Sequence, residues 1–292
     1  MNAVQVQFRT RGSLAYSIGG DGPALVLLHP IGMDRSLWAP YMQHWLPRYR
    51  VIAADMLGHG ESGPIRGSVS LADHACAVLE VIEAEGLASA VVMGVSMGGM
   101  VAQSMAIAAP DRVQGLVLCA TAGGFPEASR AAIRSRGDSS RRGDMSSEVI
   151  ESTAARWFAS DTPSELVERC CAKLALNDWH SWSVNWEAIS ELDHLSVLSR
   201  LTMPALVVAG DRDASIPVAV SKELADALKA DFVVLENSAH FGAFDAPQRI
   251  EPVVDRFLAR LHADRVATDS PLRTAASECP SRPMRSGERG VP

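Results

Sequence analysis

The chain has 292 residues, 47% hydrophobic and 21% charged, which is long enough for one large domain with a buried core. Its 27 basic and 34 acidic residues give a net charge of -7, so no basic surface is expected for nucleic acid or an anionic membrane. No apolar stretch approaches the roughly 18 residues of a membrane span, and the alternating residues 1–8 indicate a strand rather than a secretory signal.

Short apolar runs alternate with helical patterns along most of the chain. Several runs, such as residues 24–28 and 205–208, are apolar throughout, as in parallel strands buried on both faces. The glycine-rich segment 19–22 favours an antiparallel start. We therefore expect an α/β fold with a mostly parallel sheet of about eight strands flanked by helices. The predicted strands are 4–8, 13–18, 24–29, 50–55, 90–95, 113–120, 204–210 and 231–236, and the predicted helices are 36–46, 71–85, 98–108, 218–229 and 247–261.

Residues 122–201 break this alternation, because they contain polar residues and helical patterns but no convincing strand. We interpret them as a helical cap inserted into an α/β core formed by residues 1–121 and 202–262. Within the cap, residues 130–142 carry five arginines, for which a solvated face is favoured over an anion site. Residues 263–292 are rich in Ser, Pro, Arg and Thr and nearly lack large apolar residues, so we expect a disordered tail.

The pattern Gly-x-Ser-x-Gly, centred on Ser96, lies between an apolar strand and an apolar helix. A serine on such a sharp turn has strained backbone angles, and its neighbours need to be almost without side chains, as Gly94 and Gly98 are. The turn lifts the hydroxyl above the sheet and directs a helix N-terminus at the reaction centre. Ser96 is therefore the predicted nucleophile.

A serine nucleophile needs a base with a pKa near neutrality, and histidine is the usual one. Of eight histidines, His240 follows the last predicted strand, whereas His29 and His59 are expected to organise loops by hydrogen bonding. The acid that orients this imidazole follows the strand at 204–210, where the residues alone leave both Asp211 and Asp213 open, with a slight preference for Asp213.

Acyl transfer also needs two N–H donors aimed at the oxygen that becomes negative. One is expected from Met97, directly after the nucleophile. The other is expected from the loop after the strand at 24–29, where Ile31 is the candidate because Pro30 has no N–H.

Together these residues resemble the α/β-hydrolase superfamily over about residues 4–262. The matching segments are 29–32, 55–62, 94–99, 210–213 with Pro217, and 239–240. In that family the acid falls three residues after the glycine that ends the strand, so the resemblance points to Asp213. It also implies Ile31 and Met97 as oxyanion donors. Serine instead of aspartate at the nucleophile position argues against haloalkane dehalogenase or epoxide hydrolase chemistry.

Within the superfamily the chain is similar to 3-oxoadipate enol-lactonases, in residues 32–38, 130–134 and 155–158. It departs from them at residues 178–186, where tryptophans and a histidine replace smaller residues. These rings either line a larger, more apolar pocket or pack the cap helices together. The predicted substrate pocket consists of Trp157, Trp182, Trp186 and Phe241.

The predicted activity is that of a serine hydrolase that cleaves a small carboxylic ester or lactone through an acyl-enzyme. The alternatives are a C–C bond hydrolase of ring-fission products, a cofactor-free perhydrolase resembling haloperoxidases, and a non-enzymatic scaffold. We expect no cofactor, no metal, no nucleic acid and no membrane partner. The five cysteines lack metal-ligand spacing and are interpreted as reduced thiols of a cytoplasmic protein. The oligomeric state does not follow from the sequence.

Overall fold

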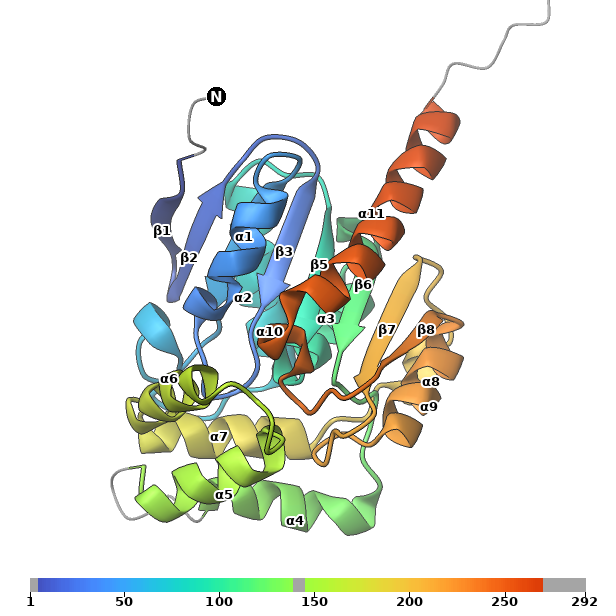
Figure 1. Ribbon diagram of the computed structural model, residues 1–292. Coiled ribbons are helices and arrows are strands. Elements are labelled where there is room, and N and C mark those ends of the chain that lie inside the picture. Colours follow the sequence, from blue (N-terminus) through green and yellow to red (C-terminus); the bar gives the residue numbers. More distant parts are fainter. Residues whose placement is uncertain (1–4, 139–144, 270–292) are drawn as a thin grey trace, which may run out of the picture.

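An eight-stranded sheet forms the centre of the protein in a computed structural model that describes residues 5–138 and 145–269 (Figure 1). The strand order is β1-β2-β4-β3-β5-β6-β7-β8. The β1–β2 and β2–β4 pairs are antiparallel and all other pairs are parallel, which confirms the predicted fold class. The strands are β1 (Gln7–Arg11), β2 (Leu14–Gly19), β3 (Ala24–Leu28), β4 (Arg50–Asp55), β5 (Ala90–Val95), β6 (Val113–Cys119), β7 (Ala205–Gly210) and β8 (Asp231–Leu235).

Burial follows position in the sheet. Strands β3, β5 and β7 are buried at every residue, as their uninterrupted apolar runs predict. Strand β2 is also buried throughout, whereas the edge strand β1 is exposed. Helices α1 and α11 cover one face and α2 and α3 the other (Figure 1). The helices of this core are α1 (Ala39–Trp45), α2 (Leu71–Ala84), α3 (Met97–Ala108), α9 (Val218–Leu228), α10 (Gly242–Asp245) and α11 (Pro247–Asp269).

The segment between β6 and β7 is helical and lies across the carboxyl ends of the parallel strands (Figure 1). We refer to its described residues, 122–138 and 145–201, as the cap. Its helices are α4 (Glu127–Asp138), α5 (Ser147–Trp157), α6 (Ser164–Ala175), α7 (Trp179–Ser190) and α8 (Leu195–Leu198). Side chains at the carboxyl ends of the strands, where α/β folds place their sites, therefore face the cap.

The bounds of strand β1 and helix α11 differ from those expected from sequence. Strand β1 begins at Gln7 rather than residue 4, because the hairpin turn at Gly12, with φ 55°, sets its register against β2. Helix α11 continues to Asp269, past residue 262, since no helix-breaking residue interrupts it there. The rest of the predicted tail, 270–292, lies outside the described residues. No helix in the described segments combines the length and apolar character needed to cross a membrane.

Candidate active site

Ser96 lies at the turn between β5 and α3, with φ 54° and ψ -118°. This backbone conformation is rare for a residue with a side chain and persists only where the surroundings enforce it. Three hydrogen bonds do so. The Ser96 N–H donates to the carbonyl of Cys119 at 2.9 Å, and its carbonyl accepts from the Thr121 hydroxyl at 2.7 Å and the Gly99 N–H at 2.9 Å.

The glycines beside Ser96 are required by close backbone contacts. A Cβ on Gly94 would lie 2.2 Å from the carbonyl oxygen of Gly98, and a Cβ on Gly98 would lie 2.2 Å from that of Leu28. Both contacts are with backbone, which cannot move aside as a side chain could. The turn therefore seats the N-terminus of α3 against the end of β3, as the Gly-x-Ser-x-Gly pattern predicts.

His240 and Asp213 converge on Ser96 from two other loops. The Nε2 of His240 lies 3.0 Å from the Ser96 Oγ, and its Nδ1 lies 2.8 Å from Asp213 Oδ2. All three residues are buried. The other carboxylate oxygen accepts the N–H groups of Ser215 at 2.8 Å and Ile216 at 2.9 Å, so Asp213 acts as an acceptor on both oxygens. The carboxylate fixes Nδ1 as the donor and leaves Nε2 as an acceptor for the hydroxyl proton.

The other acid that the sequence left open lies elsewhere. Asp211 is exposed, and its Oδ1 accepts the N–H of Ser238 at 3.0 Å. It therefore braces the loop before His240 from outside, while Asp213 contacts the imidazole.

The two expected oxyanion donors lie on adjacent segments. A Cβ on Gly98 would also lie 2.8 Å from the His29 carbonyl, so the first turn of α3, which begins at Met97, touches the start of the loop that carries Ile31. As the first residue of a helix, Met97 has an N–H with no acceptor inside the helix. The Pro30 carbonyl accepts a hydrogen bond from Met33 N at 3.3 Å. Because the peptide between Pro30 and Ile31 is trans, the Ile31 N–H points in the direction opposite to this carbonyl, away from the turn that the hydrogen bond closes.

His29 and His59 organise loops, as expected, and neither is hydrogen-bonded to Ser96. His29 Nε2 accepts the Met56 N–H at 2.9 Å, so its Nδ1 carries the proton and donates to the Pro30 carbonyl at 2.8 Å. His59 Nδ1 donates to the Leu57 carbonyl at 3.0 Å. Burial lowers the pKa of His29 to about 4 and that of His59 to about 3, the latter helped by the charge of His29, so both imidazoles are neutral near pH 7.

A small cavity opens at Ser96 and His240, with core side chains on one side and cap side chains on the other. Its free volume of about 20 Å³ has room for about one water molecule. A molecule larger than water can therefore enter only if some of the lining side chains move. The cavity is lined by Ser96, Met100, Ser215, Ile216 and His240 from the core and by Phe125, Ile133, Arg136, Trp157, Trp186 and Ile189 from the cap.

The four aromatic residues expected in the pocket divide into two pairs. Trp157 and Trp186 line the cavity. Trp182 does not, because it packs on Gly32 and its Nε1 donates to the Arg136 carbonyl at 3.3 Å. Phe241 lies behind the lining and stacks on Trp157 with ring centroids 5.0 Å apart. The ring-rich segment of α7 therefore both lines the cavity and packs the cap.

Arg136 is the charged cap residue of the cavity that the sequence interpretation missed, together with the uncharged Met100, Phe125, Ile133, Ile189, Ser215 and Ile216. Its guanidinium lies 5.2 Å from the ring centroid of Trp186, and burial, with the nearby charge of Arg156, lowers its pKa. The predicted solvated face holds for Arg130 and Arg134, which pair with Glu191, and is wrong for Arg136. The other two arginines of the cluster lie outside the described residues. The available signal was helical spacing, since Ile133 and Arg136 are three apart and share a face.

The described residues contain neither a metal-binding cluster nor a paired cysteine. Within residues 5–138 and 145–269, no group of three or more His, Cys, Asp or Glu side chains is arranged to hold a metal ion. Four of the five cysteines lie in these segments and all four are free.

Comparison with known proteins places this geometry in a family. Residues 25–253 match the model of the alpha/beta hydrolase family. The chain belongs to this family. With Ser96 on a strand-to-helix turn, this alpha/beta hydrolase has the arrangement in which the fold presents a nucleophile.

Relatives of this alpha/beta hydrolase support a hydrolase enzyme. Over 246 residues the chain is 27% identical to 3-oxoadipate enol-lactonase 2 of Acinetobacter baylyi, covering 83% of this chain and 91% of the relative. Over 257 residues it is 25% identical to the (E)-2-((N-methylformamido)methylene)succinate hydrolase of the same organism, covering 87% and 97%. Among solved structures, the enol-lactonase from Burkholderia xenovorans is similar, with a TM-score of 0.79, 27% identity, and coverage of 84% and 96%.

Proposed function

We propose that Ser96, His240 and Asp213 form a catalytic triad that cleaves a small carboxylic ester or lactone through an acyl-enzyme. The observation that carries the proposal is the buried hydrogen-bonded line from Asp213 through His240 to Ser96, with contacts of 2.8 and 3.0 Å. A hydroxyl, an imidazole and a carboxylate in this order allow a proton to leave the serine as its oxygen attacks.

In the first half-reaction, the Ser96 Oγ attacks the carbonyl carbon and His240 takes the hydroxyl proton on Nε2. The imidazolium that forms is stabilised by Asp213. The carbonyl oxygen becomes an oxyanion and receives hydrogen bonds from the N–H groups of Ile31 and Met97. When the tetrahedral intermediate collapses, the ester C–O bond breaks and His240 returns its proton to the leaving alkoxide. For a lactone, the new hydroxyl stays attached to the acyl group.

In the second half-reaction, water replaces the alcohol. His240 removes a proton from the water, which attacks the acyl carbonyl of the ester formed on Ser96. The same two donors stabilise the second oxyanion, and its collapse releases the carboxylic acid and regenerates the Ser96 hydroxyl.

A carboxylate on the acyl part of the substrate fits the cavity best. Apart from His240 and Arg136, the side chains that line the cavity are apolar or uncharged. The guanidinium of Arg136 is suited to bind a carboxylate through two parallel hydrogen bonds. The names of the two curated relatives, an oxoadipate enol-lactonase and a substituted succinate hydrolase, also denote acids. We therefore propose a small ester or lactone that bears an acid group.

Replacing Ser96 tests the proposal. Ser96→Ala is expected to lower kcat for p-nitrophenyl acetate on the order of 10⁶-fold, because the nucleophile is lost while the fold remains. Wild-type protein should be labelled at Ser96 by a fluorophosphonate, and the variant should not. A Ser96→Ala protein with near-wild-type turnover, or a label on another residue, would remove Ser96 from the mechanism.

A further inference from the structure

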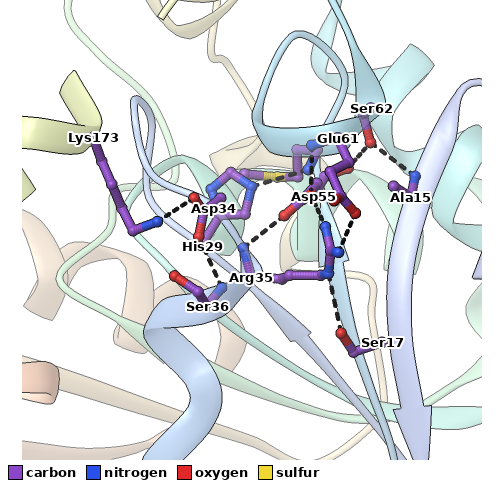
Figure 2. A network of polar contacts seen from close by, with 11 residues as sticks. Ala15, Ser17, His29, Asp34, Arg35, Ser36, Asp55, Glu61, Ser62 and Lys173 are labelled. Atoms are coloured by element: carbon purple, nitrogen blue, oxygen red, sulfur yellow. Dashed lines mark hydrogen bonds and ion pairs between the residues drawn. The ribbon is translucent and has the colours of Figure 1, made fainter. Parts of the chain in front are cut away.

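The loop of residues 29–35, here called the oxyanion loop, is anchored to the core at both ends (Figure 2). At its start, His29 accepts the N–H of Met56. At its end, the Arg35 N–H donates to Asp55 Oδ1 at 2.7 Å, and its guanidinium pairs with the same carboxylate. The Asp55 side chain is only 1% exposed. The core therefore fixes where the loop begins and ends.

The middle of the oxyanion loop is held from the cap instead. Lys173, in the last turn of α6, forms an ion pair with the carboxylate of Asp34 (Figure 2). Burial alone would raise the pKa of Asp34, but hydrogen bonds from Lys173 and Ser36 lower it, so the carboxylate stays charged. Asn177 Nδ2 donates to the Gly32 carbonyl at 2.9 Å and also to the Lys173 carbonyl at 3.0 Å, joining the end of α6 to the loop.

Side chains of the cap also pack directly against the oxyanion loop at Gly32. Gly32 has φ 75°, and a Cβ there would lie 2.6 Å from Leu174 Cδ2 and 2.8 Å from Trp182 Cζ3. Helices α6 and α7 thus press directly on the residue that follows the expected donor Ile31. A shift of α6 would move this part of the loop with it.

We propose that Lys173 and Asn177 are positioning residues that hold the Ile31 N–H in the oxyanion hole from the cap side. The inference rests on the proposed acyl-enzyme function. An oxyanion donor has to lie within about 2.7–3.1 Å of the place where charge develops, so small displacements of the loop weaken it. The cap contacts fall one and three residues after Ile31. Before Ile31, the Pro30 carbonyl accepts hydrogen bonds from Met33 N at 3.3 Å and from His29 Nδ1 at 2.8 Å, so the core holds the peptide on one side of the donor and the cap holds the other side.

A purely structural role for the ion pair is less consistent with its surroundings. The side chains of Lys173 and Asp34 are 21% and 23% exposed and border an open hollow of about 380 Å³. Contact with solvent on this side screens the pair in part, so its contribution to stability is expected to be smaller than that of a fully buried pair. Its geometric effect on the loop is expected to exceed its effect on unfolding.

The experiment separates transition-state effects from binding. In Lys173→Met, which keeps the apolar stem, kcat for p-nitrophenyl acetate is expected to fall about tenfold, while KM changes less than about twofold. The affinity of phenylboronic acid, which forms a tetrahedral adduct with a serine nucleophile, should fall in parallel with kcat/KM. The pH profile of kcat/KM should not move, because His240 and Asp213 are untouched.

Five variants serve as comparisons. Lys173→Arg should restore most of kcat, and Lys222→Met, which removes a surface ion pair with Asp226, should change nothing. Asp34→Asn, which retains the oxygen that accepts the Ser36 N–H, should reproduce the loss if Lys173→Met does not fold. The Lys173→Met/Asp34→Asn double variant should be no worse than either single variant, because both remove one interaction. Asn177→Leu should lower kcat in the same way.

Two results would overturn the proposal in distinguishable ways. In the first, the wild type forms the boronate adduct and turns over the ester, but Lys173→Met keeps full kcat and shows only a lower thermal stability or a changed KM. The positioning role is then wrong and the triad stands. If the wild type forms no adduct and shows no turnover, the proposed function fails and this inference fails with it.

Discussion

The core and the cap hold their functional side chains in different ways. In the core, Ser96 is fixed by three short backbone and hydroxyl hydrogen bonds, and a Cβ on either neighbouring glycine would lie 2.2 Å from a backbone oxygen. In the cap, α4 carries Arg136 but buries only Ile133 and Gly137 among its residues. Its other arginines pair with exposed Glu191. The core around Ser96 is over-determined in one geometry, whereas the cap helix that carries Arg136 rests on few buried residues.

This difference assigns separate tasks to the two regions. A nucleophile and its base must keep their distance within a few tenths of an ångström, which suits rigid elements. A cavity with room for about one water has to open for a substrate, which suits a region of lower local stability. Changes at Ser96 and its partners in the core should therefore abolish the chemistry, and changes among the cap side chains that line the cavity should alter which substrates are accepted.

The largest effect is expected from the core acid. Asp213→Asn should lower kcat by about 10⁴-fold, because an amide cannot accept the His240 Nδ1 proton and the N–H groups of Ser215 and Ile216 together without presenting its NH₂ to one of them. Asp211→Asn is the matched control and should retain activity within about threefold, because Asp211 contacts only the loop. The measurement is kcat for p-nitrophenyl acetate with circular dichroism of each variant. Equal losses in both variants would mean that Asp213 is not the acid.

An intermediate effect is expected from the cap. Arg136→Met should lower kcat/KM for p-nitrophenyl hydrogen succinate by about 10- to 100-fold, mostly through KM, because the guanidinium that binds its carboxylate is lost. Hydrolysis of neutral p-nitrophenyl butyrate should stay within about threefold. Arg134→Met, on the same helix but paired with Glu191 at the surface, should affect neither substrate. An equal loss of kcat/KM for both esters in Arg136→Met would mean that this arginine supports the structure of the cap rather than binds a carboxylate.

The same division decides what the sequence could predict. Strands β4 and β5 and helix α3 followed from apolar periodicity and from Gly-x-Ser-x-Gly, because those patterns reflect local geometry. The choice between Asp211 and Asp213 did not follow from the residues alone, since both follow one strand, and only the family resemblance pointed to Asp213. It depends on which carboxylate meets both the N–H groups at 215–216 and the distant imidazole of His240.

In the cap, orientation was the missing information. Trp182 and Trp186 are four residues apart on α7 and share a face, yet one packs on Gly32 and the other lines the cavity. Arg136 lies in an arginine-rich segment that is polar enough to be solvated, and only the packing of α4 against α7 turns it inward. Such docking depends on contacts between helices rather than on periodicity within one.

The smallest effect concerns the boundary between the two regions. His74, on α2, is bonded through Nε2 to Asn185 Oδ1 of α7 at 2.9 Å, and burial, with the charge of His59, lowers its pKa to about 4. Between pH 6.5 and pH 4 the unfolded chain binds a proton at this position that the folded protein does not. The stability from the neutral imidazole is therefore complete above pH 6.5, falls as the pH drops towards 4, and is constant below that.

The expected slope for one such histidine is about 1 kcal/mol per pH unit in the free energy of unfolding. His74→Gln keeps a donor for Asn185 but cannot titrate, so urea unfolding from pH 7 to pH 4 should show a shallower decline than wild type. His180→Gln, at the cap surface with a bond to the Gly67 carbonyl, should leave the slope unchanged. A wild-type slope in His74→Gln would show that the boundary tolerates a charged imidazole. The acid sensitivity of the protein would then originate within the core or the cap rather than between them.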